Sequence, residues 1–598
     1  MSEKKLIKPY EKSVENLIFS ENRYIFMVGA GISIDPPANL LPAPQFIQYL
    51  LELCAPIEEI QNLLSLKTLR YEMIVELIQR YIDYGLEFMD YFEFGTEPNL
   101  IHLFLAQAIM KGHAVYTTNF DYLIEYGLQK LLPDDKKSHI LPVITKHDFI
   151  NNQNPNESFS DGNFPIYKLH GAKKNVITNI KTTDSLMTTM SAFGKGDVVL
   201  SLEPHKKNSF KEISKNETII IMGYSGSDDF DIAPVLRTLF DIKSLIWIDH
   251  HKKDSFEIYE FDPKAAFVIP KGLNRTERLL AEISSNTEAQ VIMIKTNTSK
   301  FIEEKLWALL FDKEQIPKID KSKTSKVPQF QDWINKKFPN VPEVLKWKST
   351  ADLYLELGFK DDFYRCSQKG LKIAQEIKSK KMEAEFQNLM GVYHYNEKAF
   401  DEALSFFEKA LEINKEMGNQ QLQGSRINNI GLIHLEKGNY EEAMKLFEEA
   451  FKIAQGRGDY HGMATRLNNM GLVYLKQEDY EKAIEKLKEA LKYDKKSGNL
   501  AGHVIRLTNI GDTYKSQQKF PEALENYRNA YQIVQKLSDR IKMGKLLIEL
   551  GKTHADMNDL GKAITNLRKA IDILKDTGDK VSLFEAEETL KGVKKLLK

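Results

Sequence analysis

The stretch YIFMVGAGIS, Tyr24 to Ser33, joins a short apolar run to a cluster of small residues. The run is typical of a strand that is buried on both faces of a sheet. Gly29 and Gly31 follow it directly, and glycines at the end of a buried strand let the backbone turn tightly and approach a ligand closely. By itself the pattern fits a phosphate-holding loop and an ordinary turn equally well, so its meaning depends on the rest of the chain.

The region from about residue 20 to residue 300 alternates strand-like and helix-like segments. Its other β-rich runs are AVYTTNF, PIYKLHG, DVVLSL, ETIIIMGY, SLIWIDH and AQVIMIK, and helical-period segments such as NLIHLFLAQAIMK separate them. Buried strands that alternate with helices predict an α/β domain with a parallel sheet.

Three polar stretches follow β-rich runs in the same way as GAGIS does. VYTTNFD contributes Asn119 and Asp121, YKLHG contributes His170, and IIIMGYSGSDDF contributes Gly223, Ser225, Gly226 and Asp228. The carboxyl ends of parallel strands border the crevice in which such sheets bind nucleotides. We therefore expect the four stretches to converge on one nucleotide site, although Asn119 alone could close a turn and His170 alone could be a structural histidine.

The region from about residue 345 to the end repeats with a period of 40 residues and contains no strand-like run. The period is held by Gly391, Gly431, Gly471, Gly511 and Gly551, by Ala403, Ala443, Ala483, Ala523 and Ala563, and by Ala410, Ala450, Ala490, Ala530 and Ala570. Small residues let paired helices approach closely, so the pattern predicts an all-α solenoid. It resembles the tetratricopeptide repeat (TPR) in a 40-residue form, with five clear units and a degenerate first unit around residues 349–375.

A second series recurs in the first helix of the repeats. It consists of Arg426, Arg466 and Arg506, of Asn428 and Asn468, and of Asn429, Asn469 and Asn509. Amide side chains can pair with the backbone of an extended peptide and guanidinium groups with its acids, which favours a groove that recognises a peptide or protein. The same residues could instead cap turns, solvate a helix face, or pack against the first half of the chain or another subunit.

Composition narrows the class of protein. The formal net charge is −1 and there are only two cysteines, Cys54 and Cys366. No nucleic-acid partner is indicated, and a disulfide framework or a four-cysteine zinc site is excluded. No run has the roughly 20 apolar residues of a membrane span and the N-terminus has no signal-peptide pattern, so we expect a cytoplasmic protein.

Taken in order, GAGIS, TTNFD, KLHG and GYSGSD resemble the sirtuin family: its phosphate loop, its Asn-containing loop, its histidine loop and its second Gly-Ser nucleotide loop. The resemblance covers about residues 15–300 and implies a Rossmann-like domain that binds NAD+. It is closest to the bacterial sirtuin-like proteins of antiviral defence, which fuse this domain to a sensor and hydrolyse NAD+. We accordingly place a catalytic domain at 1–310, a linker at 311–345 and a TPR array at 346–598.

Departures from the family pattern argue against protein deacetylation. The paired cysteines of the zinc ribbon are missing, the segment after GAGIS is IDPPANLLPAP, and Thr118 replaces the usual Gln. The resemblance therefore implies cleavage of NAD+ as a substrate, with no metal and no prosthetic group. Transfer of ADP-ribose to a protein and non-catalytic sensing of an NAD-derived nucleotide remain alternatives.

The resemblance also implies a role for each site residue. Asn119 would position the ribose or a water molecule, Asp121 would bind the nicotinamide side and His170 would act as general base. The nucleotide itself would be held by Gly29, Ala30, Gly31, Ser33, Thr118, Gly223, Ser225, Gly226 and Asp249. Because unrestrained NAD+ hydrolysis would kill the cell, we expect the array to gate the enzyme in a homo-oligomer and to bind a phage or other protein trigger.

Overall fold

The computed structural model describes residues 6–66, 69–186, 202–225, 232–251, 256–262, 272–311, 315–319, 325–537, 539–575 and 579–596. The chain forms two compact units. The described residues of the first, which we call the sheet unit, are those of 6–50, 83–186 and 202–339. Those of the second, the array unit, belong to 51–82 and 340–596.

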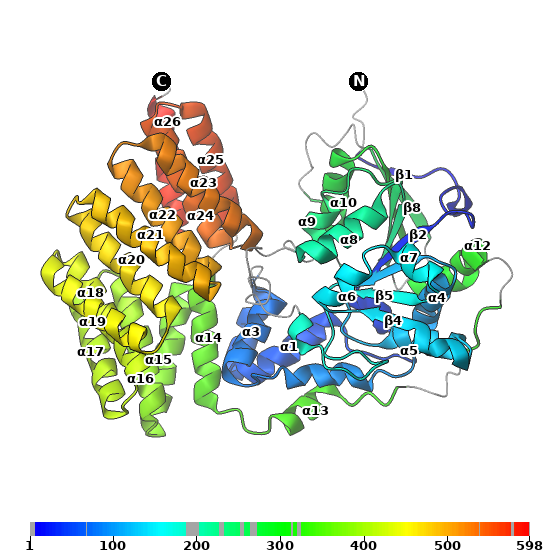
Figure 1. The fold of residues 1–598 in the computed structure, drawn as a ribbon, viewed down its shortest axis with the longest axis horizontal. Helices are drawn as coiled ribbons and strands as arrows, with labels where there is room; N and C mark the ends of the chain where they lie inside the picture. Colours follow the sequence, from blue (N-terminus) through cyan, green and yellow to red (C-terminus); the bar gives the residue numbers. More distant parts are fainter. Residues whose placement is uncertain are drawn as a thin grey trace. The chain divides into compact units, whose positions relative to one another are not determined.

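One sheet organises the sheet unit (Figure 1). Its described strands are β1 (Ile7–Pro9), β2 (Tyr24–Val28), β3 (Ala114–Thr117), β4 (Ile140–Val143), β5 (Phe164–Lys168), β6 (Thr218–Met222), β7 (Ser244–His250), β8 (Glu257–Phe261) and β9 (Gln290–Thr296). They lie in the order β1-β8-β9-β7-β6-β2-β3-β5-β4, and every pair from β4 to β9 is parallel. The order reverses at β2, as in doubly wound nucleotide-binding folds. The predicted Rossmann-like parallel sheet is confirmed.

Helices cover both faces of this sheet. The described helices of the unit are α1 (Ala43–Cys54, which continues into the array unit), α4 (Leu100–Met110), α5 (Leu123–Leu131), α6 (Lys146–Asn151), α7 (Pro155–Ser160), α8 (Pro204–Ser214), α9 (Ile232–Leu236), α10 (Arg275–Asn286), α11 (Thr298–Phe301), α12 (Trp307–Phe311) and α13 (Phe330–Lys337). Side chains of β2 alternate between two cores. Phe26 packs with Phe104 of α4, whereas Met27 belongs to the core that contains Leu280 of α10.

The array unit contains thirteen consecutive helices within the described residues: α14 (Glu343–Leu357), α15 (Lys360–Glu376), α16 (Lys380–Asn396), α17 (Phe400–Glu416), α18 (Gln420–Glu436), α19 (Tyr440–Gly456), α20 (Tyr460–Lys476), α21 (Tyr480–Ser497), α22 (Leu500–Ser516), α23 (Phe520–Leu537), α24 (Arg540–Asp556), α25 (Leu560–Leu574) and α26 (Lys580–Leu596). The periodic glycines lie where paired helices touch. A Cβ on Gly431 would stand 2.7 Å from the Phe447 ring, and one on Gly511 would stand 2.6 Å from Tyr527. The predicted solenoid is confirmed.

The Arg and Asn series has a different role from the one expected for it. Asn469 Nδ2 donates to Asn428 Oδ1 at 2.7 Å, and Asn509 Nδ2 donates to Asn468 Oδ1 at 2.6 Å. Arg426 pairs with Glu385 at 3.2 Å. Arg466 and Arg506 donate more weakly to Ser425 and Thr465, one repeat earlier. Arg426, Arg466 and Arg506 are only 4%, 8% and 3% exposed, so the series fastens neighbouring repeats together.

The array unit also includes two helices from the first hundred residues, α2 (Ile57–Ser65) and α3 (Tyr71–Tyr81). Glu59 of α2 accepts hydrogen bonds from Arg365 of α15 at 2.9 Å and from Tyr354 of α14 at 3.0 Å. Lys348 of α14 donates to Tyr81 of α3 at 3.0 Å. Helices that precede most of the sheet in the chain therefore cap the start of the array. No described helix is long and apolar enough to span a bilayer.

Candidate functional site

The four central strands end at the same level. Val28 of β2 pairs with Thr117 of β3 and with Met222 of β6, and Thr117 pairs with Lys168 of β5. The stretches that begin at Gly29, Thr118, Leu169 and Gly223 therefore leave adjacent parallel strands side by side. The sheet therefore brings the four stretches together at one edge, as expected. They meet at the switch point between β2 and β6.

A compact polar cluster forms where β2 and β3 end. Ser33 Oγ donates to Asp121 Oδ2 at 2.8 Å, and Asn119 Nδ2 lies 3.2 Å from both Ser33 Oγ and Asp121 Oδ2. The three residues are 2%, 5% and 5% exposed. Asp121 Oδ1 accepts from the Leu123 backbone at 3.1 Å. Both Asp121 oxygens are thus occupied by the protein, which favours a positioning role over the expected contact with nicotinamide.

His102 of α4 completes this cluster, and sequence reasoning missed it. Its Nδ1 accepts from the Asn99 backbone at 3.2 Å, so in the neutral ring Nε2 carries the proton, and it donates to Ser33 Oγ at 3.1 Å. Burial lowers the pKa of His102 to about 4, although Asp121 acts in the opposite direction. His102 is therefore a neutral donor and cannot act as a base toward Ser33. The capping pattern Asn99-x-x-His102 before an apolar run was the available clue.

This cluster determines how the Asn119 amide is oriented. With Nδ2 directed at Ser33 and Asp121, Oδ1 faces away from both, and no described residue donates a hydrogen bond to it. A buried amide oxygen without a donor costs about 1 to 3 kcal/mol. Such an atom in a native fold calls for a missing partner, which a bound ligand or water can provide.

The glycines of GAGIS serve the packing of two loops. Gly29 N–H donates to Met222 O at 3.1 Å and Gly31 N–H to Gly223 O at 2.9 Å. A Cβ on Gly31 would stand 2.9 Å from the Gly223 backbone. Ser33 is also saturated, since its one proton goes to Asp121 and both lone pairs accept. These bonds engage the N–H groups of Gly29 and Gly31, and Ala30 between them is exposed.

Lys168 of the KLHG stretch holds the backbone of Asp121 in place. Its ammonium donates to the Asp121 carbonyl and forms a buried ion pair with Glu125 at 3.1 Å. Both side chains are at most 1% exposed. Burial raises the pKa of Glu125 against the effect of Lys168. Because a buried charge is tolerated only when it is paired, this pair fixes the loop that carries Asn119.

His170 lies in the turn that follows β5. Leu169 N–H donates to Thr117 O at 2.8 Å, and Gly171 has a φ of +77° in a place where a Cβ would collide with the Ser185 backbone. The half-buried imidazole packs against the Phe120 ring at a centroid distance of 6.0 Å. His170 is thereby held beside the loop of Asn119.

The other predicted residues lie around this edge of the sheet. Thr118 extends the pairing of β3 with β2 through a 3.0 Å bond to Val28. Ser225 is exposed, and Gly226 and Asp228 lie outside the described residues. Asp249, near the end of β7, is 3.4 Å from His251 Nε2. Among the described residues, no three His, Cys, Asp or Glu side chains gather as metal ligands.

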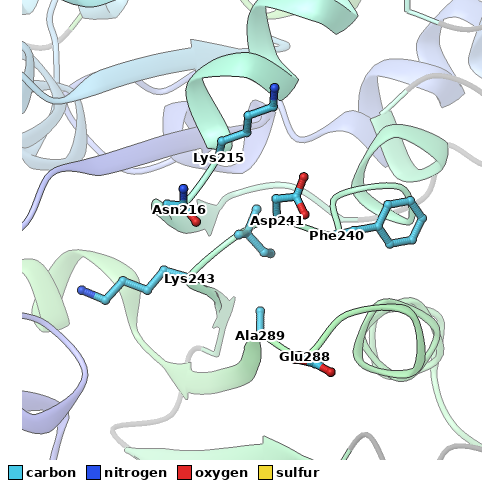
Figure 2. Close-up of a pocket in the computed structure, with 8 residues that line it drawn as sticks. Lys215, Asn216, Phe240, Asp241, Lys243, Glu288 and Ala289 are labelled. Carbon is cyan, nitrogen blue, oxygen red and sulfur yellow. The ribbon is translucent and has the colours of Figure 1, made fainter.

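One pocket of the sheet unit lies elsewhere. It measures about 470 Å³ and is lined by Lys215, Asn216, Phe240, Asp241, Ile242, Lys243, Glu288 and Ala289, as Figure 2 shows. Lys243 and Ala289 immediately precede β7 and β9, and Asn216 lies two residues before β6. The pocket is therefore at the amino ends of the strands, opposite the polar cluster.

Comparisons with known proteins agree with this architecture. The model of the SIR2-like domain family matches residues 113–263, and tetratricopeptide repeat models match 384–417, 425–496 and 504–576. No curated protein matches the chain significantly.

Solved structures that resemble the chain include a Rap protein complexed with Competence and Sporulation Factor, which is 14% identical, with 45% of this chain and 80% of that chain covered and a TM-score of 0.38. Another is the apo form of the quorum sensor NprR from B. thuringiensis, which is 16% identical, with 50% and 80% covered and a TM-score of 0.32. The family matches, the sheet and the helical repeat together identify the chain as a SIR2-like domain fused to a tetratricopeptide-repeat array.

Proposed function

We propose that this protein cleaves NAD+ into nicotinamide and ADP-ribose with water as the acceptor. One observation carries the proposal: the buried Asn119 Oδ1 lacks a donor at the switch point of a parallel sheet. It lies within the 113–263 segment that matches the SIR2-like family. A ribose hydroxyl or a water molecule is the donor that such a substrate would supply.

The chemistry suits these residues. The bond between nicotinamide and C1′ breaks with oxocarbenium character, and nicotinamide leaves as a neutral molecule, so a strong general acid is not required. Asn119 Oδ1 would accept a hydrogen bond from the attacking water or from the ribose. His170 would take the proton of the water as the new C1′–O bond forms. Ser33, Asp121 and His102 would keep the Asn119 amide in its productive orientation.

The nucleotide would lie across the β2 and β6 loops. We assign the pyrophosphate to the exposed edge of the loop at Ala30 and Gly31 and to Ser225, and the adenosine hydroxyls to Asp249. Gly29, Gly223 and Thr118 would act by keeping the two loops packed, and Gly226 continues the second loop. The reaction as proposed uses NAD+ as its substrate and no prosthetic group.

The biological role that we propose is antiphage defence by depletion of NAD+, in a homo-oligomer gated by the array. Holding activity near 1% at rest requires a bias of about 2.7 kcal/mol toward an inactive form. Concave solenoid surfaces commonly bind protein segments, which supports a protein trigger. The trigger would use exposed groove residues, because Arg426, Arg466, Arg506, Asn428 and Asn468 are engaged between repeats.

The test is to incubate the purified full chain with NAD+, with and without phage lysate, and to resolve all products. We expect nicotinamide and ADP-ribose in equal amounts. Asn119→Ala should abolish their formation, whereas Asn208→Ala, at an exposed position of α8, should not. ADP-ribose attached to protein would show that the enzyme is a transferase and not a hydrolase. A cyclic product would indicate attack by a group of the substrate itself. Binding of NAD+ without its consumption would indicate a sensor.

A further inference from the structure

A segment that resembles a linker in sequence lies against the sheet unit in the structure. Residues 325–338, which we call the strap, end one residue before the unit does. Ser325 N–H donates to Pro37 O at 3.0 Å, just beyond the GAGIS loop. Ser325 Oγ accepts from the backbones of Thr96 at 3.2 Å and Glu97 at 2.9 Å. The buried Ser325 therefore joins the segment after GAGIS to the one that precedes Asn99 and His102.

Aromatic packing holds the next part of the strap. Phe330 of α13 is 1% exposed, and its ring centroid lies 4.7 Å from those of Phe46 and Tyr91. Tyr91 belongs to a short 3-10 helix, η3 (Glu87–Phe94). Burial of a Phe side chain contributes about 1.5 to 3 kcal/mol, so α13 is anchored on η3.

An ionic joint links the end of the strap to the loop of His170. Asp90 of η3 accepts from Lys337 of α13 at 2.6 Å and also from Lys173, three residues after His170. Burial raises the pKa of Asp90, but the bonds from Lys173 and Lys337 outweigh it and lower that pKa overall. Asp90 thus remains a carboxylate shared between the two ammonium groups.

Ring contacts connect the same helix to the candidate catalytic histidine. Phe46 lies 5.3 Å from Phe92 of η3, Phe92 lies 6.0 Å from Phe120, and Phe120 lies 6.0 Å from His170, all between ring centroids. Phe120 is the residue between Asn119 and Asp121. The helix η3 therefore contacts the strap on one side and both catalytic loops on the other.

We propose that the strap positions the His170 loop for NAD+ cleavage, with Asp90 as the positioning residue, and that the array acts on the reaction through it. The inference rests on the proposed function. The array follows directly at Asn340, three residues after Lys337, so a displacement of its first helix would be transmitted along the chain to the Lys337–Asp90 ion pair. A two-state movement of this joint would change the site without any contact between trigger and substrate.

The test compares three variants of the full chain: Lys337→Met, Lys337→Arg and Lys336→Met. Lys336 is the exposed neighbour on α13 and serves as the matched control. For Lys337→Met we expect at least tenfold faster hydrogen exchange at the amides of Ala172 and Lys174 and at least tenfold lower kcat. KM should stay within twofold, because the NAD+ contacts are elsewhere. Lys337→Arg and Lys336→Met should match the parent in both measurements.

Each result decides a separate point. Unchanged exchange in Lys337→Met overturns the strap, whatever the activity. Faster exchange with unchanged kcat overturns the positioning role and leaves a purely structural anchor. A parent chain that never consumes NAD+ refutes the proposed function, and the exchange measurement then still decides whether the strap holds the His170 loop.

Discussion

The sheet unit and the array unit both bury polar side chains, but they arrange them differently. In the sheet unit, Ser33, His102 and Asn119 come from separate segments and meet at one point, where one oxygen is left without a donor. In the array, Asn428 and Asn469 repeat with the helical units and satisfy one another from repeat to repeat. Asn414 Oδ1 of the array is also buried without a hydrogen-bond partner among the described residues, so an unmet bond alone does not mark a site. Polar groups that converge from separate segments at the ends of parallel strands indicate a site, whereas periodic groups that pair with the next repeat indicate a scaffold.

The largest effect that would separate the two regions is loss of catalysis without loss of stability. We expect His170→Ala to lower NAD+ turnover about a thousandfold, within the range of a lost general base. The half-buried imidazole contributes little to the core, so the melting temperature should change little. Turnover assays and thermal unfolding of the same preparation measure both. Near-normal turnover would remove His170 from the reaction.

Acid should destabilise the sheet unit through two of its buried histidines. Burial lowers the pKa of both His102 and His113 to about 4. Because this is below the usual value near 6.5, the unfolded chain binds protons that the folded chain does not between these pH values. The free energy of unfolding therefore has its full value above about pH 6.5. It falls by up to about 3 kcal/mol per histidine as the pH approaches 4.

Unfolding of the sheet unit followed from pH 7 to pH 4 measures this loss. His102→Asn should make the free energy of unfolding less dependent on pH, because one of the two titrating histidines is removed. A variant whose curve retains the slope of the parent would show that His102 is not the group that titrates.

A smaller effect of the opposite kind is expected in the array. Asn469→Ala leaves Asn428 Oδ1 buried without its donor, which costs about 1 to 3 kcal/mol. The double variant with Asn428→Ala should cost less than the sum of the two single changes, because both remove the same bond. Denaturant unfolding provides the values, and Asn396→Ala, at an exposed position, is the control. NAD+ turnover should be unaffected, and additive costs would contradict the pairing of Asn469 with Asn428.

The smallest expected change in stability distinguishes the glycines that recur every 40 residues from a glycine that does not. Nothing lies within 4 Å of a Cβ placed on Gly592 in α26. Gly592→Ala should therefore stabilise the array by about 0.5 to 1 kcal/mol through helix propensity. Gly431→Ala should destabilise it, since the new methyl group would meet Phe447. Equal shifts in melting temperature would show that the period is unrelated to packing.

Local patterns predicted the fold well. The strand-like runs and the 40-residue period depend on neighbours in the sequence, and both were confirmed within the described residues. The run DVVLSL, except for its last residue, lies outside the described residues. The convergence of Gly29, Asn119, His170 and Gly223 also followed, because parallel strands end at a common edge. The site assignments themselves stay predictions.

Distant contacts could not be predicted in this way. His102 has the sequence of an ordinary helix start, and its bond to Ser33 spans 69 residues. The Lys-rich and Pro-rich composition around Ser325 favoured a linker, yet Phe330 and Lys337 find partners at Tyr91 and Asp90. For the arginine series, spacing indicated which helix carries it but not whether the guanidinium groups face solvent or the next repeat.

The capping of the array by α2 and α3 has a consequence for how the protein is made. Tyr81 leaves the ribosome well before Glu343 is synthesised, which at about 5 to 20 residues per second is an interval of roughly ten to fifty seconds. Throughout that time Glu59 has neither Arg365 nor Tyr354 to bind. The two halves are therefore not interchangeable modules that a single cut or gene fusion can separate. Any exchange of arrays between such proteins has to carry residues 51–82 with it.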